Sequence, residues 1–367
     1  MAFIKVLVVD DSAFMRRQLT AILEADPKIT VVGTARNGEE ALAKLKELEP
    51  DVITLDINMP VMDGLTALTY LMLERPTPTV VISSLTHEGA LATFEALELG
   101  AVDFVAKSSG TVSLDIRSVA DEIVAKVRSA ARARLRRKPA RALASQPRPA
   151  AARSERPKAP KAGRPASADG LDPIVAIGVS TGGPRTLLDI LPSLPDDLPA
   201  PVVIVQHMPP AFTKSFAEHL DAACQIPVKE AEQGEKLLPG RGYVAPGGLH
   251  LTTVRSAFGA GAAARLQNRT DNAMFCPSVG VLFDSVAKLY GPRAVGVLLT
   301  GMGDDGADGL VAIRRAGGIT IAESEATAVI FGMPREAIER GGAEIVAPST
   351  DIASQIQAAL RRIAPGE

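Results

Sequence analysis

A serine flanked by glycines stands where a predicted strand passes into a predicted helix. The segment IVAIGVSTGGPRTLLDIL contains Gly178-Val179-Ser180-Thr181-Gly182, which fits the G-x-S-x-G pattern of a nucleophile on a sharp turn. Glycine permits the turn, and the N-terminus of the following helix offers N–H groups to a developing oxyanion. A phosphate-binding turn is the alternative, although a Walker loop would continue with Lys-Ser or Lys-Thr where Pro184-Arg185 follows here. The pattern alone leaves both interpretations open.

A nucleophilic serine needs a base, and the sequence contains only four histidines. His207 follows the apolar run PVVIVQ, so it lies at the same edge of the predicted sheet as Ser180. His87 opens a predicted helix, His219 lies within another, and His250 falls in the run GGLHL, where a packed histidine is expected. His207 is therefore the candidate base, with an ordinary loop histidine as the alternative.

A third predicted strand, VGVLL, ends in the acidic glycine-rich turn TGMGDDGADG. Asp304 or Asp305 could hold the imidazole in one tautomer and stabilise its cation. Three strand ends that supply Ser, His and Asp meet the geometric requirements of a catalytic triad. The chain order Ser–His–Asp differs from the Ser–Asp–His order of α/β-hydrolases, which disfavours that superfamily.

Strand ends of the N-terminal region carry a second set of polar residues. The set consists of Asp10 and Asp11, Asp56, Ser83 and Ser84, and Lys107, which follow the first, third, fourth and fifth predicted strands. Three converging carboxylates repel one another unless a cation binds, and oxygen ligands favour Mg²⁺. A hydroxyl and an ammonium group opposite them suit a phosphoryl group carried on one of the acids. For any single acid, a helix cap is the alternative.

Two bodies of alternating strands and helices must position these residues. In the first, strands are predicted at 4–9, 30–33, 52–55, 79–82 and 104–106, and amphipathic helices near 14–24, 38–48, 65–74, 88–99 and from 114 onward. In the second, strands are predicted at 174–177, 202–205, 242–245, 249–254 and 294–299, and helices after Pro184, Ala211, Ser278, Gly306 and Arg335. An antiparallel hairpin is expected near 242–268. The pattern predicts an α/β fold with two doubly wound, mostly parallel sheets.

A basic segment rich in proline and alanine separates the two bodies. Between 130 and 168, 12 Lys and Arg side chains stand against one acid, and no residue is aromatic. The net charge is −7 on residues 1–129 and −6 on residues 169–367, so two acidic bodies flank a segment of charge +11. Nucleic-acid contact is one interpretation, but such binding usually comes with a folded reader or interleaved aromatic residues. We therefore expect domains at 1–129 and 169–367, joined by a flexible linker at 130–168.

Composition narrows the class of protein and its compartment. With 46% apolar residues the chain can build sizeable cores, which excludes global disorder. The longest uncharged run, 198–213, is too short and too rich in proline to span a membrane, and the N-terminus has no signal pattern. Cys224 and Cys276 fit neither a disulfide framework nor a zinc site, so we expect buried thiols in a reduced cytoplasm.

Residues 1–129 resemble the receiver domain of bacterial response regulators through the motifs VLVVDDS, ITLDINMPVMDG, ISS and DFVAK. The resemblance implies that Asp56 accepts a phosphoryl group. It also implies that Asp10, Asp11 and the backbone carbonyl of Asn58 hold Mg²⁺ together with Asp56.

The same resemblance assigns roles to the far side of the acidic pocket. Ser83 is implied as the switch hydroxyl, Phe104 as the rotating aromatic residue and Lys107 as the phosphate contact. Ser108 stands where the family usually has a proline with a cis bond, so the loop after Lys107 departs from the family pattern.

Residues 171–363 resemble the catalytic domain of bacterial chemotaxis protein-glutamate methylesterases through IGVSTGGP, VQHMPP, YVAPGGLHL and LLTGMGDDGADG. The implied site residues are Ser180 as nucleophile, His207 as base, Asp305 as orienting acid, and Thr181 and Met302 around the oxyanion. The first acid of the pair, Asp304, stands where the family often has Asn.

Together the resemblances imply a phosphorylation-activated serine esterase of chemotaxis adaptation. Its implied substrates are glutamate γ-methyl esters on chemoreceptors, with deamidation of receptor glutamines by the same chemistry. Mg²⁺ would serve the receiver, a histidine kinase would be the phosphodonor, and the esterase step would need no cofactor. We expect a cytoplasmic monomer with no nucleic-acid partner and no direct membrane insertion. A DNA-binding or scaffold-type response regulator is the alternative, although no helix-turn-helix is visible and a scaffold leaves the triad unexplained.

Overall fold

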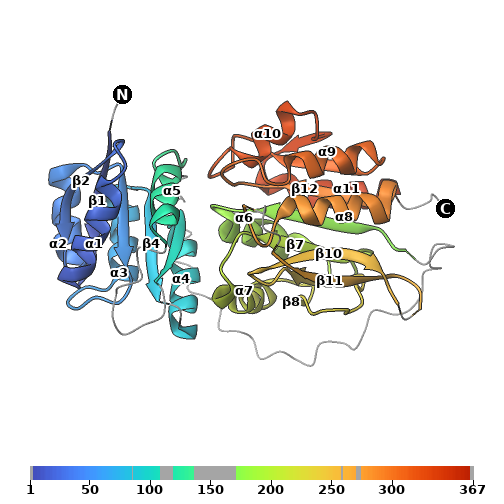
Figure 1. Cartoon of the computed structure of the whole chain (residues 1–367), viewed down its shortest axis with the longest axis horizontal. Helices are drawn as coiled ribbons and strands as arrows, with labels where there is room; N and C mark the ends of the chain where they lie inside the picture. The colour runs from blue at the N-terminus through green and yellow to red at the C-terminus, as the bar shows by residue number, and fades with distance from the viewer. Residues whose placement is uncertain are drawn as a thin grey trace. The chain divides into compact units, whose positions relative to one another are not determined.

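The computed structural model describes residues 3–84, 86–107, 119–135, 171–257, 259–269 and 274–363. The chain divides into two compact units, Met1–Leu135 and Arg136–Glu367 (Figure 1). Ser108 and most of the expected linker lie outside the described residues, so the linker and its boundaries at 129/130 and 168/169 stay predictions.

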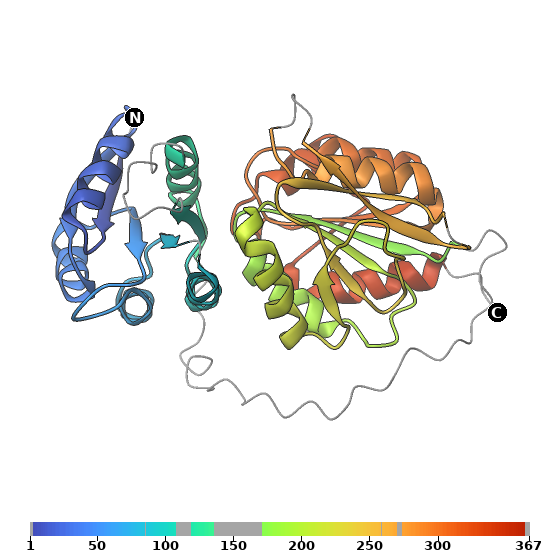
Figure 2. The same cartoon turned by 60° about the horizontal axis from the view of Figure 1, so that its bottom comes forward.

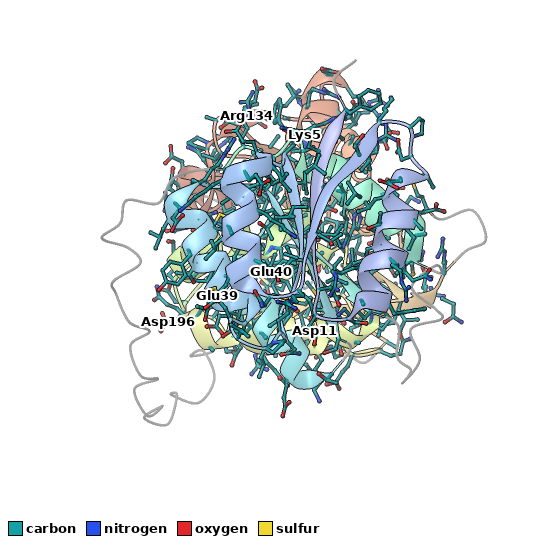
Figure 3. All side chains as sticks on the ribbon, turned by 90° about the vertical axis from the view of Figure 1, so that its left-hand side faces the viewer. Lys5, Asp11, Glu39, Glu40, Arg134 and Asp196 are labelled. Carbon is teal, nitrogen blue, oxygen red and sulfur yellow. The ribbon has the colours of Figure 1, made fainter. Side chains whose placement is uncertain are left out.

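The first unit is a parallel sheet of five strands in the order β2-β1-β3-β4-β5, with helices on both faces (Figure 2). The strands are β1 (Ile4–Val9), β2 (Ile29–Ala35), β3 (Val52–Asp56), β4 (Thr79–Ser84) and β5 (Asp103–Lys107). The helices are α1 (Ala13–Glu24), α2 (Gly38–Leu48), α3 (Gly64–Glu74), α4 (His87–Leu99) and α5 (Ala120–Ala130). Lys5 lies near the amino end of β1 and Asp11 lies beyond its carboxyl end, so the two residues mark the two ends of the parallel strands (Figure 3). The predicted doubly wound architecture is confirmed here.

The second unit has a parallel sheet of seven strands in the order β14-β13-β12-β6-β7-β9-β8 and a separate antiparallel pair, β10 and β11. The strands are β6 (Ile174–Val179), β7 (Val202–Gln206), β8 (Val228–Glu230), β9 (Gly242–Val244), β10 (Leu249–Arg255), β11 (Ala262–Asn268), β12 (Ala294–Leu298), β13 (Ile319–Glu323) and β14 (Ile345–Ala347). The α-helices are α6 (Gly183–Ile190), α7 (Pro210–Ala223), α8 (Val279–Tyr290), α9 (Ala307–Arg315), α10 (Met333–Glu339) and α11 (Ser349–Ile363). Two short 3₁₀ helices, η3 (Leu191–Ser193) and η4 (Gly291–Arg293), follow α6 and α8.

The expected hairpin near 242–268 is present, but only its C-terminal part is antiparallel. β10 pairs with β11 over the whole length of both strands, whereas β9 joins the main sheet parallel to β7 and β8. β9 is fully buried, like the central strands β6, β7 and β12. Such strands read as unbroken apolar runs because helices or loops cover both of their faces.

The core of the second unit joins the parallel sheet to the hairpin through α8. Its buried side chains come from β6, β7, β10 and β12, and from one face of α8 and α9. Cys224 is buried as expected, whereas Cys276 is partly exposed, and both are free thiols. No helix in the described ranges combines the length and the apolar character needed to cross a membrane.

Candidate functional site

Ser180 lies immediately beyond β6, on a turn whose backbone is fixed from two directions. Its N–H donates to the Thr300 carbonyl at 2.9 Å, and its own carbonyl accepts from the Gly183 N–H at 2.8 Å. Gly182 caps α6 with φ +80°, a left-handed backbone conformation that favours glycine. A Cβ at this position would also lie 2.6 Å from the Val329 side chain. The glycines thus permit the tight strand-to-helix turn that the motif predicts.

The structure brings Ser180, His207 and Asp305 into one hydrogen-bonded chain. His207 Nδ1 lies 3.1 Å from Ser180 Oγ, and His207 Nε2 lies 2.7 Å from Asp305 Oδ2. A carboxylate can only accept, so the proton of the neutral ring is on Nε2 and the lone pair of Nδ1 faces the serine. The three side chains come from the ends of β6, β7 and β12, which are neighbours in the sheet. This arrangement can remove the Ser180 proton and stabilise the resulting imidazolium.

Asp305 is held in a cradle at the N-terminus of α8. Its carboxylate accepts hydrogen bonds from the Ser278 hydroxyl at 2.8 Å, the Val279 N–H at 2.7 Å and the Gly280 N–H at 2.9 Å. Burial alone would raise the pKa of Asp305, but the hydrogen bonds and charge of His207 and the backbone N–H groups lower it below its ordinary value. Asp305 therefore stays ionised and keeps the orientation that His207 requires.

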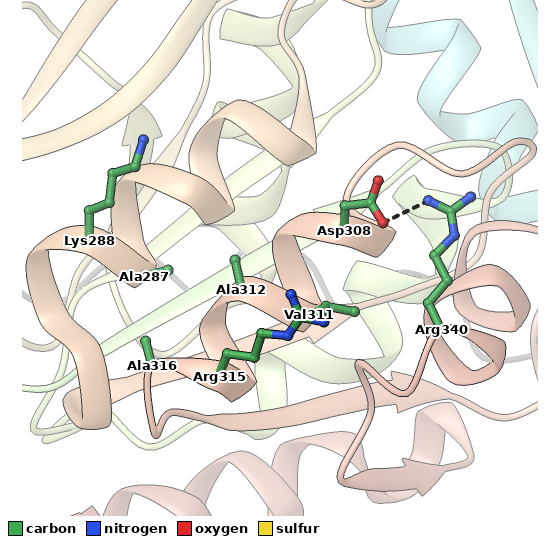
Figure 4. A pocket seen from close by; sticks show the side chains of 8 residues that line it. All are labelled: Ala287, Lys288, Asp308, Val311, Ala312, Arg315, Ala316 and Arg340. Carbon is green, nitrogen blue, oxygen red and sulfur yellow. Dashed lines mark ion pairs between the residues drawn. The ribbon is translucent and has the colours of Figure 1, made fainter.

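The neighbouring acid, Asp304, faces away from His207 and pairs with Arg340. Arg340 Nη2 lies 2.6 Å from Asp304, and Nη1 lies 3.0 Å from Asp308. The pair with Asp308 lies at the rim of a surface pocket between α8 and α9, and none of Ser180, His207 and Asp305 lines that pocket (Figure 4). Of the two acids that the sequence left as alternatives, Asp305 is thus the one that contacts His207, and Asp304 contacts Arg340.

Thr181 and Met302 are each next to a backbone position that meets the serine. Thr181 follows it directly, and its carbonyl accepts from the Thr300 hydroxyl at 2.9 Å. Met302 follows Gly301, whose added Cβ would lie only 2.8 Å from Ser180 Cβ. Within the described part of the chain, no group accepts a hydrogen bond from the Met302 N–H.

Two residues of this site were not singled out from the sequence. The Phe275 ring stacks on the His207 imidazole, with 4.3 Å between ring centroids and 6° between planes. Ser278 was predicted only as the start of a helix, and its contact with Asp305 joins residues 27 positions apart. The serine before the run VGVLF signals an N-cap, but no local signal shows which carboxylate the helix end would meet. His250, expected to be packed, is indeed buried, with its Nδ1 accepting from the Ser278 N–H at 3.3 Å.

In the first unit, three carboxylates meet at the ends of β1 and β3. Oxygen atoms of Asp10, Asp11 and Asp56 lie within 4.8 Å of one another. The Lys107 ammonium group lies 3.1 Å from Asp10 and 2.9 Å from Asp56. Burial, together with the charges of Asp10 and Asp11, raises the pKa of Asp56 even though Lys107 opposes the shift. Burial would lower the pKa of Lys107, but Asp56 and Asp10 outweigh it and raise that pKa. An all-oxygen donor set with excess negative charge fits Mg²⁺.

The other predicted residues of this pocket lie around it. Ser83 follows the β4 residue that pairs with Asp56, and its hydroxyl donates to the Gly89 carbonyl at 3.1 Å. Phe104 on β5 is buried, with the Lys126 ammonium group 5.0 Å from its ring centroid. Asn58 is exposed in the loop after β3, two residues beyond Asp56. Ser83 and Asn58 therefore lie at the carboxyl edge of the sheet, as does Lys107 at the end of β5, whereas Phe104 is the second residue of β5.

The fold and the site together define a serine hydrolase domain joined to a doubly wound domain. The latter has an acidic pocket of the kind that accepts a phosphoryl group. The family model for CheB methylesterase matches residues 175–356, and the model for the response regulator receiver domain matches residues 6–117. The chain belongs to the protein-glutamate methylesterase/protein-glutamine glutaminase family. This domain pair is that of a phosphorylation-regulated chemotaxis methylesterase and not of a DNA-binding regulator.

Individual relatives cover nearly the whole chain. The protein-glutamate methylesterase/protein-glutamine glutaminase of Caldanaerobacter subterraneus is 54% identical over 350 residues, which are 95% of this chain and 94% of that protein. A second one, from Carboxydothermus hydrogenoformans, is 53% identical over 364 residues, or 98% of this chain and 100% of that protein. The crystal structure of the Thermotoga maritima CheB methylesterase catalytic domain shares 44% identity, covers 50% of this chain and 96% of that chain, and has a TM-score of 0.48.

Proposed function

We propose that Ser180 is the nucleophile that hydrolyses γ-methyl esters of glutamate on chemoreceptors, and that the same site deamidates receptor glutamines. The observation that carries the proposal is the continuous hydrogen-bonded chain Ser180–His207–Asp305. Family membership supports the substrate class, since the relatives are named for both activities.

In the first half of the reaction, Ser180 Oγ attacks the ester carbonyl while His207 Nδ1 takes the serine proton. Asp305 stabilises the imidazolium through Nε2–H, and the Met302 N–H and the turn at Thr181 face the developing oxyanion. His207 then returns the proton to the methoxide leaving group, and methanol departs from the acyl-enzyme.

In the second half, water attacks the acyl-enzyme and His207 accepts its proton. The tetrahedral intermediate collapses to release the glutamate carboxylate and restores the Ser180 hydroxyl. With glutamine the leaving group is ammonia, and the steps are otherwise the same. His207 carries each proton transfer, so we propose no cofactor for the esterase step.

For the first unit, we propose that Asp56 accepts a phosphoryl group from a histidine kinase. Asp10, Asp11, Asp56 and the Asn58 carbonyl would hold Mg²⁺, which when bound neutralises the charge that gathers during phosphoryl transfer. Lys107 would contact the phosphoryl group, and Ser83 and Phe104 would respond to it. We propose that the whole chain acts as a cytoplasmic monomer without a nucleic-acid partner.

Methanol release from methylated receptor membranes tests the esterase proposal. Ser180→Ala should lower the rate by several orders of magnitude while Asp56 still accepts phosphate, because the mutation removes only the nucleophile. Ser193→Ala, at an exposed serine in η3, is the matched control and should keep wild-type activity. Near-normal methanol release by Ser180→Ala would exclude Ser180 as the nucleophile, whereas no methanol release by the wild type would favour a scaffold function.

A further inference from the structure

Gln206 links the backbones of the two residues that exchange a proton. It is the last residue of β7, it is 3% exposed, and its side-chain Nε2 lies 3.0 Å from the Ser180 carbonyl and 3.1 Å from the His207 carbonyl. A glutamine amide has two N–H donors, so one Nε2 can serve both carbonyls at once. The two residues belong to different loops, which begin after the paired strand ends Val179 and Gln206.

The opposite end of the same amide has no hydrogen-bond partner among the residues that the structure describes. There Gln206 Oε1 is buried and accepts no hydrogen bond, an arrangement that costs folding free energy. The chain also leaves room for this oxygen, because a Cβ on Gly183 would lie 2.0 Å from it. An apolar side chain of similar length would avoid the cost. The two N–H groups are thus what a glutamine supplies here and a packed hydrocarbon would not.

The rest of the hydrogen bonding around Ser180 and His207 shows what this link adds. The Ser180 N–H donates to the Thr300 carbonyl in the loop after β12, and the His207 N–H donates to the Val179 carbonyl at 3.2 Å. Both bonds fix the chain as it enters each residue, whereas Gln206 donates to the carbonyl on the exit side of each; the Ser180 carbonyl also accepts from the Gly183 N–H at 2.8 Å. Small displacements of reacting groups cost large factors in rate, so the separation of Ser180 Oγ and His207 Nδ1 must be set closely.

We propose that Gln206 is a positioning residue that sets the distance between the nucleophile and its base. The proposal rests on the assignment of Ser180 and His207 as that pair. The Gln206 amide then has two different effects. Its N–H donors contribute to catalysis, whereas its unpartnered oxygen lowers the stability of the fold.

The test replaces Gln206 with methionine, which keeps the length of the side chain and removes both donors and the buried oxygen. Gln206→Met should lower kcat for methanol release about 10-fold or more, with KM within about 2-fold of wild type. Its thermal midpoint should stay close to that of the wild type. Gln225→Met is the control, because exposed Gln225 donates one hydrogen bond to the Pro192 carbonyl away from the site.

Activity is expressed per reactive serine, counted by titration with a fluorophosphonate. A purely structural role would reduce the number of titratable sites and leave kcat per site at the wild-type value, which would overturn the proposal. If the methionine variant does not fold, Gln206→Glu, which has the same shape, replaces it in the test. This variant should show the same decrease in kcat at pH 7. Wild-type protein that reacts with the fluorophosphonate but releases no methanol would contradict the proposed substrate, whereas fully active variants would contradict only the role of Gln206.

Discussion

At the scale of single residues, two adjacent aspartates in the loop between β12 and α9 have different partners. Asp305 accepts four hydrogen bonds, from His207, Ser278, Val279 and Gly280. Asp304 is 61% exposed in its side chain and pairs with Arg340 at the surface. Exposed ion pairs contribute little, whereas a buried acceptor that loses its charge no longer stabilises the imidazolium.

Asp305→Asn should therefore lower kcat for methanol release by about 10⁴-fold, as loss of the orienting acid does in other triads. Asp304→Asn should stay within about 2-fold of wild type, because it removes only a screened surface charge. Both variants are measured on the same methylated receptor membranes. The opposite ranking would assign the orienting role to Asp304.

Val61 is a strained residue near Asp56. It has φ +69°, its side chain is 76% exposed, and the Met62 N–H donates to the Pro60 carbonyl at 2.8 Å across it. A γ-turn with positive φ is rare, and a β-branched residue in it carries strain of about 1–3 kcal/mol. The turn is kept in place by the Gly38 N–H, which donates to the Met62 carbonyl at 3.0 Å.

Val61→Gly should raise the free energy of unfolding of the first unit by about 1 kcal/mol, after the greater chain entropy of glycine is subtracted. Hydrogen exchange of the buried β1 amides in the whole chain measures this quantity. Val61→Ala keeps most of the strain and should change exchange much less. Faster exchange in the glycine variant would show that the valine side chain stabilises the turn.

At the scale of secondary-structure elements, the ends of β1 and β3 place like charges together in a buried position. Because the pKa of Asp56 is raised above its ordinary 3.8, the folded unit binds this proton more tightly than the unfolded chain does. Stability therefore falls as the pH rises from 3.8 through the folded-state pKa, and the ionised carboxylate is destabilising at neutral pH.

Asp56→Asn should accordingly slow hydrogen exchange of the first unit at pH 7 without Mg²⁺, with a smaller difference near pH 4. Adding Mg²⁺ should stabilise the wild type more than the variant, since the variant has lost one carboxylate ligand. Equal stabilisation of both proteins by Mg²⁺ would show that Asp56 is not a ligand. The variant should also accept no phosphate from a small phosphodonor.

At the scale of the whole molecule, each unit has its own sheet, and the chain joins a regulated domain to a catalytic one. We expect the unphosphorylated receiver to restrict access to Ser180, and phosphate on Asp56 to relieve that restriction. A switch of this kind needs a difference of only a few kcal/mol between two states. Residues 1–129 and 169–367 carry net charges of −7 and −6, so we expect any restricting interaction between them to be local and largely apolar.

The fragment 169–367 should therefore release methanol faster than the unphosphorylated whole chain. Phosphorylation should raise the activity of the whole chain and leave that of the fragment unchanged. The two proteins are compared at equal concentrations of fluorophosphonate-reactive serine. A fragment slower than the resting whole chain would mean that the receiver activates or targets the enzyme.

How far the sequence predicts this molecule depends on whether the signal is local. β1 is predicted to the residue and β3 to within one residue, because buried parallel strands read as apolar runs. The edge strand β8 has only three residues, of which two, Lys229 and Glu230, are charged, so it carries no such run. The contacts of Ser278 with Asp305 and of Phe275 with His207 cross between distant segments, so only the fold brings them together.

The strand order β12-β6-β7 also says what it would take to graft this active site onto another protein. The serine follows the middle strand, and the histidine that follows one neighbouring strand contacts it with Nδ1, the nitrogen nearer its own backbone. The more distant Nε2 is then left to reach the acid, which arrives from the neighbour on the other side. A host scaffold would need three consecutive parallel strands ending at one level, with a helix N-terminus ready to hold the acid.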